Sequence, residues 1–513
     1  MRAMLLASAA LATALAFPAA PALPAFPAAP ALPVSPVAPG PPTRTASAPG
    51  PPAWPSSGPV PAPAPAAFRA CSGVPSDFDG DGRADLAVAA PYTEVGGHAR
   101  AGSVTVLYGM RTERRLTQDD PGVPGEAETG DAFGSALATG DFDGDRCADL
   151  AVGVSEEDRP GPGSDGRGVV QLFRGSPGGL RPGAVLDAGD LGRGRGPDRF
   201  GAALAAGDLD GDGDDELVIG IPGLGGGGVG VHGTRGRRPY VVTQRTRWVG
   251  QRERKTDQFG SVLATGDFDG DGRAEIAVGA PADSLRKSGE GSVTVLDVRR
   301  REALRLTQDS PGVAGAAEPW DAFGAALATG DFDADGRADL AVGVPGEGLT
   351  ANQRAMDYGD GTVVTVRGSA RGLRTATSEA FSQRGLDGVP RYFDRFGAAL
   401  AAGDLNGDGD DELAIGAPGE NAVQVLAGTR SGGLTKRNDL LVTGRGGDFG
   451  AALAIVPGRG LVVAAPASGR LVLLRGGTRE RAQTGVRPAT ARTLATGAGS
   501  ALFGYALRGS GSR

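Results

Sequence analysis

Short apolar strands recur along the chain in a fixed order, separated by turns rich in glycine and polar residues. Seven Phe-Gly pairs, from Phe133-Gly134 to Phe503-Gly504, each open a strand of small residues such as SALAT or AALAA. A polar loop follows, then an apolar strand that ends near Ala-Pro or Gly-Val-Pro, and then a strand with the pattern Gly-x-Val-x-Val. Runs of this length bounded by turn residues predict β-strands. A fourth, weaker strand closes several repeats.

The repeat length and the two ends of the pattern predict a closed ring. The polar loops begin at intervals of about sixty-odd residues, which is enough for one four-stranded sheet per repeat. The first loop, at Asp77, has no Phe-Gly strand before it, whereas the last Phe-Gly strand, 503–507, has no loop after it. We therefore predict an all-β fold of seven blades in which the C-terminal strand completes the blade that begins at Asp77. A closed ring leaves no exposed sheet edge.

Five of the loops carry carboxylates at positions 1, 3, 5 and 9, as in DFDGDGRADLAV from Asp77 and DFDGDGRAEIAV from Asp267, and a sixth carries them at positions 1, 5 and 9. Carboxylates in this register converge on one hard cation, and oxygen-only ligation with a backbone carbonyl at position 7 specifies Ca²⁺ rather than a transition metal. An EF-hand loop opens in the same way but needs a glutamate at position 12 and flanking helices. Position 12 is apolar here, at Val88 and Ile219, so calcium loops in β-hairpins are expected. The alternative, six acidic surface turns, does not explain the sixfold register.

The predicted calcium loops span residues 77–85, 141–149, 208–216, 267–275, 331–339 and 404–412, and about six Ca²⁺ ions are expected. Their candidate ligands, with the backbone carbonyl at position 7, are Asp77, Asp79, Asp81, Arg83, Asp85, Asp141, Asp143, Asp145, Cys147, Asp149, Asp208, Asp210, Asp212, Asp214, Glu216, Asp267, Asp269, Asp271, Arg273, Glu275, Asp331, Asp333, Asp335, Arg337, Asp339, Asp404, Asn406, Asp408, Asp410 and Glu412.

Three departures from the pattern change the expected occupancy. Arg146 stands where the other loops have glycine, and a side chain in that left-handed position costs about 1 kcal/mol, so the second site is expected to be weaker. Asn406 replaces an aspartate and removes one charge from the sixth site. The seventh repeat, IVPGRGLVV at 455–463, has lost its carboxylates and is expected to bind no calcium.

The combination of Phe-Gly, D-x-[DN]-x-D-G-x-x-D and Gly-Ala-Pro, as in AVGAP at 277–281, resembles the FG-GAP repeats of the integrin α-chain head, a seven-bladed β-propeller. The resemblance covers roughly residues 70 to 510. It implies that the calcium hairpins lie together on one face, while ligands meet the opposite face or the loops between blades. Several integrin features are absent from the sequence: an Asp-x-Ser-x-Ser signature, a transmembrane stretch and an Arg-Gly-Asp tripeptide.

The N-terminal segments predict export. Residues 1–16 carry one arginine and an apolar run too short to span a bilayer, which is typical of a signal peptide that ends between residues 16 and 24. Residues 17–66 are rich in Pro and Ala and are expected to form a disordered tether, followed by the propeller at 67–513. We therefore expect a monomeric, secreted or extracellular protein, associated with the cell wall or surface. In an exported chain the two cysteines suggest a Cys71–Cys147 disulfide, and the alternative is two unrelated buried thiols.

Composition argues against two classes of function. The formal charge of −8 would become −8 + 12 = +4 with six Ca²⁺ ions, so the acidity describes ligand clusters. No basic run is interleaved with aromatic residues, and a nucleic-acid partner is not expected. His98 and His232 are the only histidines, and the sequence contains neither HExxH nor GxSxG. The GxGxxG match at 225–230 joins two strands and opens no helix.

We accordingly expect a non-enzymatic binding or adhesion module whose partner is an extracellular protein or glycan. Two alternatives stay open: a propeller-scaffolded hydrolase or lipase-like enzyme, and a purely structural cell-wall-associated protein. Candidate contact residues lie in the longer connections, although their aromatic members could instead pack between blades. They are the loop 346–360 with Arg354 and Tyr358, the segment 379–395 with Arg391 and Tyr392, and Trp320.

Overall fold

The computed structural model describes residues 71, 73–158, 166–192, 198–233, 237–348, 359–476, 484, 492–496 and 507–508. All of them belong to one compact unit, Pro65–Arg513. The predicted signal peptide at 1–16 and tether at 17–66 lie outside these residues. Within the described ranges, none of the helices is long and apolar enough to cross a membrane.

Within these ranges the strands form seven four-stranded antiparallel sheets, here called blades 1 to 7. Blade 1 contains β28 (Leu507–Arg508), β1 (Leu86–Ala90), β2 (Ser103–Tyr108) and β3 (Thr112–Leu116). Blade 2 contains β4 (Phe133–Gly140), β5 (Asp149–Val154), β6 (Val169–Arg174) and β7 (Arg181–Leu186). Blade 3 contains β8 (Leu204–Gly207), β9 (Glu216–Ile221), β10 (Gly228–His232) and β11 (Tyr240–Val242).

The remaining blades repeat this order. Blade 4 contains β12 (Val262–Gly266), β13 (Glu275–Ala280), β14 (Ser292–Asp297) and β15 (Glu302–Leu306). Blade 5 contains β16 (Ala326–Gly330), β17 (Asp339–Val344), β18 (Thr362–Arg367) and β19 (Arg374–Phe381). Blade 6 contains β20 (Ala399–Gly403), β21 (Glu412–Ala417), β22 (Ala422–Ala427) and β23 (Thr435–Thr443), and blade 7 contains β24 (Ala452–Val456), β25 (Gly460–Ala465), β26 (Arg470–Arg475) and β27 (Arg492–Thr496).

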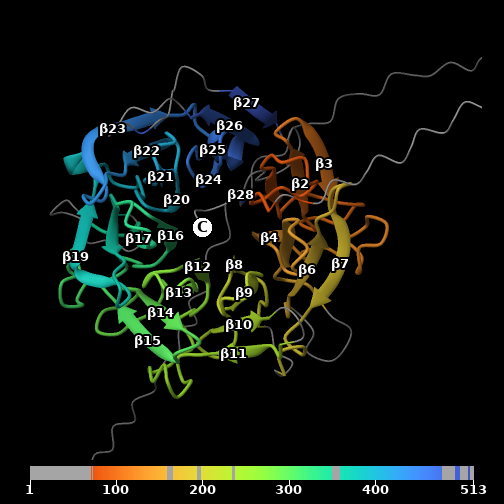
Figure 1. Cartoon of the computed structure of the whole chain (residues 1–513), viewed down its shortest axis with the longest axis horizontal. Coiled ribbons are helices and arrows are strands. Elements are labelled where there is room, and N and C mark those ends of the chain that lie inside the picture. Colours follow the sequence, from red (N-terminus) through yellow and green to blue (C-terminus); the bar gives the residue numbers. More distant parts are fainter. Residues whose placement is uncertain are drawn as a thin grey trace, which may run out of the picture. The chain divides into compact units, whose positions relative to one another are not determined.

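The first strands of consecutive blades contact one another around a centre and close a ring (Figure 1). Closure occurs in blade 1, where β28 pairs with β1 through Leu507 opposite Val88 and Arg508 opposite Ala87. The prediction that a C-terminal strand completes the blade begun at Asp77 is therefore confirmed. Of the expected strand 503–507 the described residues include only Leu507, and Phe503-Gly504 lies outside them.

The two glycine motifs meet at the contacts between blades. Gly343 lies one residue before the end of the second strand of blade 5, and a Cβ atom built on it would lie 2.1 Å from the carbonyl oxygen of Gly397 in the Phe-Gly pair of blade 6. Gly397 itself has φ +87°, a conformation that glycine adopts at low cost. The phenylalanine beside it, Phe396, is fully buried among residues of blades 5 and 6. The repeated motif thus supplies both the hydrophobic core and the close backbone approach that brings neighbouring blades together.

Candidate metal sites

The six acidic loops lie in blades 1 to 6, at the end of the blade where the first strand is followed by the second. In blades 2 to 6 the loop joins these strands directly, and its ninth residue begins the second strand, as Asp149 does opposite Gly140. In blade 1 the loop precedes β1, and the first strand is β28 from the other end of the chain. The predicted placement of the loops in β-hairpins is confirmed for blades 2 to 6.

Backbone hydrogen bonds link each loop to the loop of the preceding blade. The position 8 amide donates to the position 1 carbonyl of the previous loop, as from Asp215 to Asp141 (2.9 Å) and from Ala274 to Asp208 (2.8 Å). The same bond occurs from Ala148, Ala338 and Asp411. These five bonds place the loops side by side along one face of the ring.

The position 1 carboxylate organises each loop from within. In the fourth loop the Asp267 carboxylate accepts hydrogen bonds from the amides of Gly270 (2.7 Å), Asp271 (3.1 Å) and Gly272 (2.8 Å). Gly272 has φ +83°, and in the second loop Arg146 is held at φ +70° at the same position. The expected backbone strain at Arg146 is therefore present.

The position 9 carboxylates are buried beneath the loops. Asp85 accepts hydrogen bonds from the Phe78 amide (2.9 Å) and from the Gly109 amide beyond the third strand (2.6 Å). Burial raises the pKa of Asp85 to about 7, of Glu275 to about 8 and of Glu412 to about 9. Because burial disfavours the charged carboxylate and the neighbouring aspartates repel it, these groups favour a proton or a cation nearby.

Carboxylates from positions 1, 3 and 9 meet at one point in the first three loops. The groups whose oxygens lie within 4.8 Å of one another are Asp77, Asp79 and Asp85; Asp141, Asp143 and Asp149; and Asp208, Asp210 and Glu216. In the fourth loop Asp267, Asp269 and Asp271 form one such group. One oxygen each of Asp143, Asp210 and Asp333 is buried and accepts no hydrogen bond within the described residues. Converging carboxylates with buried, unpartnered oxygens fit a hard cation such as Ca²⁺.

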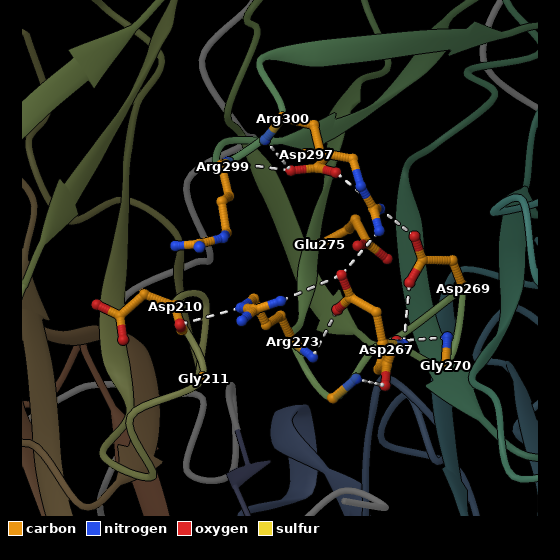
Figure 2. Close-up of polar contacts among 12 residues, drawn as sticks. Asp210, Gly211, Asp267, Asp269, Gly270, Arg273, Glu275, Asp297, Arg299 and Arg300 are labelled. Carbon is orange, nitrogen blue, oxygen red and sulfur yellow. Dashed lines mark hydrogen bonds and ion pairs between the residues drawn. The ribbon is translucent and has the colours of Figure 1, made fainter.

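One acidic residue that sequence reasoning missed joins the fourth loop. Asp297, at the end of β14, places a carboxylate oxygen within 4.8 Å of those of Asp269 and Glu275. In the same region the Arg273 side chain donates from Nε to the Asp210 carbonyl of the third loop (3.0 Å), as Figure 2 shows. Nothing in the loop register points to Asp297, because it comes from another strand.

The two cysteines form a disulfide that joins the segment before the first loop to the second loop. Cys71 and Cys147 have Cα atoms 5.0 Å apart, and the adjacent Gly73 amide donates to the Arg146 carbonyl (3.1 Å). The predicted pairing is confirmed, and the alternative of two unrelated thiols is excluded. The bond fastens blade 2 to the start of the described chain.

The sequence is similar to one repeat family and to several animal proteins. The FG-GAP repeat family matches residues 72–107, 133–173, 200–232, 259–296, 323–366 and 396–433. The chain is 32% identical to integrin alpha-PS2 of Drosophila melanogaster over 237 residues, which are 44% of this chain and 16% of that protein. It is 32% identical to integrin alpha-8 of Mus musculus over 231 residues, which are 44% of this chain and 20% of that protein. The phosphatidylinositol-glycan-specific phospholipase D of Bos taurus is 27% identical over 373 residues, 67% of this chain and 42% of that protein.

Seven four-stranded blades in a closed ring, with an acidic loop at the same end of six of them, define a seven-bladed β-propeller. The chain is an integrin-like FG-GAP repeat protein. It spans less than half the length of the relatives described above.

Proposed function

We propose that this protein is a calcium-stabilised, extracellular binding module that recognises a protein or glycan through the face opposite the acidic loops. Two exposed aromatic residues in strained backbone conformations carry the proposal. Trp320 and Phe393 each stand three residues before the Phe-Gly phenylalanine of their blade, with φ +71° and +77°. At the same position blade 2 has Gly130, with φ +107°, and blade 7 has Gly446, with φ +67°.

An aromatic side chain at this position adopts a backbone conformation that costs stability. A bulky residue with positive φ is a steric outlier that costs about 1–3 kcal/mol, and such residues cluster at functional sites. Trp320 is 39% exposed and Phe393 is 44% exposed, so both rings present a large part of their surface to solvent. Tyr392 is 43% exposed and packs edge-on against Phe393, with ring centroids 4.1 Å apart. These three residues are called the aromatic surface below.

The connections expected to make contacts meet beside the aromatic surface. The Gly346 amide donates to the Asp321 carbonyl (3.1 Å), next to Trp320, and the Arg395 amide donates to the Gly359 carbonyl (3.4 Å), next to the Phe393 segment. Exposed tryptophan and tyrosine with nearby arginine are enriched at the energetic centres of protein interfaces. The Trp320 ring lies against Gly289 of blade 4, and Tyr392 is 43% exposed, whereas Arg354 and Tyr358 lie outside the described residues.

Calcium in this proposal is structural. The aspartates at positions 1, 3 and 5, the carbonyl at position 7 and the acid at position 9 would hold about one ion per loop, six in all. Bound there, Ca²⁺ offsets the repulsion among the carboxylates. The Phe-Gly strands and the interblade hydrogen bonds then keep the opposite face in one arrangement. Export to the cell surface or wall follows from the N-terminal sequence and is part of the proposal.

A propeller-scaffolded hydrolase is the second candidate, favoured by the alignment with the bovine phospholipase D over 67% of this chain. The two histidines do not assemble a catalytic group in the described residues. His98 lies in an exposed turn of blade 1, and His232 lies at the end of β10 in blade 3, where burial lowers its pKa.

Array screening of the mature chain against glycans and extracellular proteins, with saturating calcium or with chelator, tests the binding function. The variants Trp320→Gly and Phe393→Gly remove the aromatic rings while keeping a residue that accepts positive φ, so they should fold at least as well as the wild type. Leu304→Ala, at a 40% exposed position on β15, is the matched control. We expect hits that persist in Leu304→Ala and disappear in both glycine variants. Hits that survive in the glycine variants, or turnover of a phosphodiester substrate, would contradict the proposal.

A further inference from the structure

An arginine pairs with the position 3 aspartate in four of the six acidic loops. In each case it comes from the last residue of the third strand of the same blade or from the turn that follows that strand. The pairs are Arg174 with Asp143 (2.5 Å), Arg237 with Asp210 (2.7 Å), Arg300 with Asp269, and Arg367 with Asp333 (3.5 Å).

These arginines reach the same carboxylate from different points in the sequence. Arg174 and Arg367 directly follow Phe173 and Val366, the residues that pair with the second strands of their blades. In blade 4 the corresponding place is taken by Asp297, and Arg300 reaches the loop from three residues further on. The distance along the sequence from the third strand to the arginine differs between blades, whereas the contact between the arginine and the position 3 aspartate recurs. The blades therefore share the contact and not the sequence position.

The first and sixth loops are built without this pair. At the place of Arg174 the first blade has Tyr108 and the sixth has Ala427. Within the part of the chain that the structure describes, Asp79 has no arginine within ion-pair distance. In the sixth loop Asn406 stands at position 3, and its side-chain amide donates to Glu412 (2.9 Å). The sixth loop therefore has a neutral residue at position 3, and its nearby arginine, Arg430, donates instead to the Asp408 carbonyl (3.3 Å).

The arginine occupies only the outer side of the carboxylate. In Asp143, Asp210 and Asp333 it pairs with Oδ2, while Oδ1 is buried and accepts no hydrogen bond in the described structure. Arg300 pairs with Asp269, Asp271 (2.8 Å) and Asp297 (3.0 Å) at once, as Figure 2 shows. A single guanidinium thereby partly neutralises three carboxylates that would otherwise face one another.

We propose that Arg174, Arg237, Arg300 and Arg367 are tethered counter-cations that stabilise the calcium-free loops and lower their calcium affinity. The proposal rests on calcium binding at the acidic loops, as proposed above. A bound Ca²⁺ ion compensates the same negative charges, so the guanidinium is attracted less strongly in the bound state than in the free state. By linkage, a group that favours the free state weakens binding by the same factor.

The expected size of the effect follows from Coulomb's law. The four arginine side chains are 24–61% exposed, so the dielectric constant of water is the appropriate limit. Two added positive charges about 6 Å from a guanidinium then change the binding constant about tenfold. The first loop should therefore fill at lower calcium concentration than its ligand set alone suggests. An arginine that served mainly to orient its carboxylate would have the opposite effect, because its loss would weaken binding.

Hydrogen exchange of the full chain, measured by mass spectrometry during a calcium titration after chelation, resolves the loops individually. Arg300→Gln should lower the calcium midpoint for protection of residues 267–275 about tenfold and speed their exchange in chelator, with the other loops unchanged. Arg299→Gln is the matched control, because its guanidinium forms none of the interactions drawn in Figure 2. Arg174→Gln should likewise lower the calcium midpoint for protection of residues 141–149 and speed their exchange in chelator. This loop has no acidic residue at the place of Asp297, so the arginine is tested there without that extra carboxylate.

The outcomes separate the two proposals. An unchanged or raised midpoint in both Arg300→Gln and Arg174→Gln, with calcium protection intact in the wild type, would overturn the counter-cation role alone. Equal shifts in Arg299→Gln and Arg300→Gln would overturn it as well, because general charge would then explain the effect. Absence of calcium-dependent protection in every loop of the wild type would overturn calcium binding itself, and the counter-cation role with it.

Discussion

Replacing Asp283 by glutamate should stabilise the ring at the contact between blades 3 and 4. On the face opposite the acidic loops, a glutamine at the end of one blade donates to a glutamate of the next. Such pairs are Gln118 with Glu157 (2.7 Å), Gln308 with Glu347 (2.5 Å) and Gln383 with Glu420. Between blades 3 and 4 the corresponding residues are Gln244 and Asp283. Both are fully buried, and neither amide atom of Gln244 has a hydrogen-bond partner in the described structure.

The shorter side chain explains the missing bond. Aspartate lacks one methylene group relative to glutamate, and Asp283 instead accepts from the Ser292 hydroxyl (2.8 Å) and lies 3.7 Å from Arg254. A hydrogen bond to a charged acceptor contributes about 1.5–3 kcal/mol, and an unsatisfied buried amide costs about 1–3 kcal/mol. Loss of the hydrogen bond from Ser292 and the added volume of one methylene group reduce the gain in stability. We expect Asp283→Glu to raise the free energy of unfolding by about 1–2 kcal/mol.

Equilibrium unfolding in guanidinium chloride and calorimetry, both in saturating calcium, measure this change. For a unit of residues Pro65–Arg513, an unfolding entropy of about 2.1 cal/mol/K per residue sums to roughly 0.9 kcal/mol/K, so Tm should rise by about 1–2 °C. The reverse substitution, Glu347→Asp, should lower Tm by a similar amount because it leaves Gln308 without its acceptor. The reasoning fails if Glu347→Asp is destabilising and Asp283→Glu is neutral or destabilising too.

Three further predictions address the metal, the closure of the ring and a buried acid. Calorimetric titration after chelation should give close to six Ca²⁺ per chain, and a stoichiometry of zero or one would contradict the calcium proposal. Chelation should lower Tm steeply, because each ion at a hundredfold excess over its Kd adds about 2.7 kcal/mol to the free energy of unfolding. Removal of residues 503–513 should lower the Tm of the whole ring, because β1 loses its partner strand, and an unchanged Tm would place the closure elsewhere. Burial, followed by the charge of Glu347, raises the pKa of Asp321 to about 7, so the folded state retains a proton that the unfolded state loses near pH 4. The stability of the wild type should therefore fall between about pH 4 and 7. In thermal melts in saturating calcium, the Tm of Asp321→Asn relative to the wild type should rise over that range. A Tm difference that stays constant with pH would mean that Asp321 does not titrate there.

The features predicted from sequence are those that local residue order determines. The acidic loops, the second strands and the Phe-Gly strands follow from spacing within one repeat, and β28 follows from counting repeats. The disulfide of Cys71 and Cys147 follows from having only two cysteines. What the sequence does not reveal comes from elements that meet only in the folded ring. The paired arginines stand at the end of the third strand or at different spacings after it, and Asp297 reaches the fourth loop from β14. The strain at Phe393 depends on a positive φ angle that the neighbouring residues in the sequence do not predict.

Backbone hydrogen bonds couple each acidic loop to the loop of the next blade. The carboxylate of Asp267 is a candidate ligand of the fourth loop, and its carbonyl accepts the amide of Ala338 in the fifth (2.8 Å). A cation that fixes the first residue of one loop therefore also fixes the anchor of the next, and five such bonds run from blade 1 to blade 6. Because the inner strands close on themselves through β28, a loosened loop cannot relax into a free sheet edge without opening a neighbouring interface. Loss of one ion should accordingly weaken two blade contacts, which is why a metal on one face can control the geometry of the aromatic surface on the other.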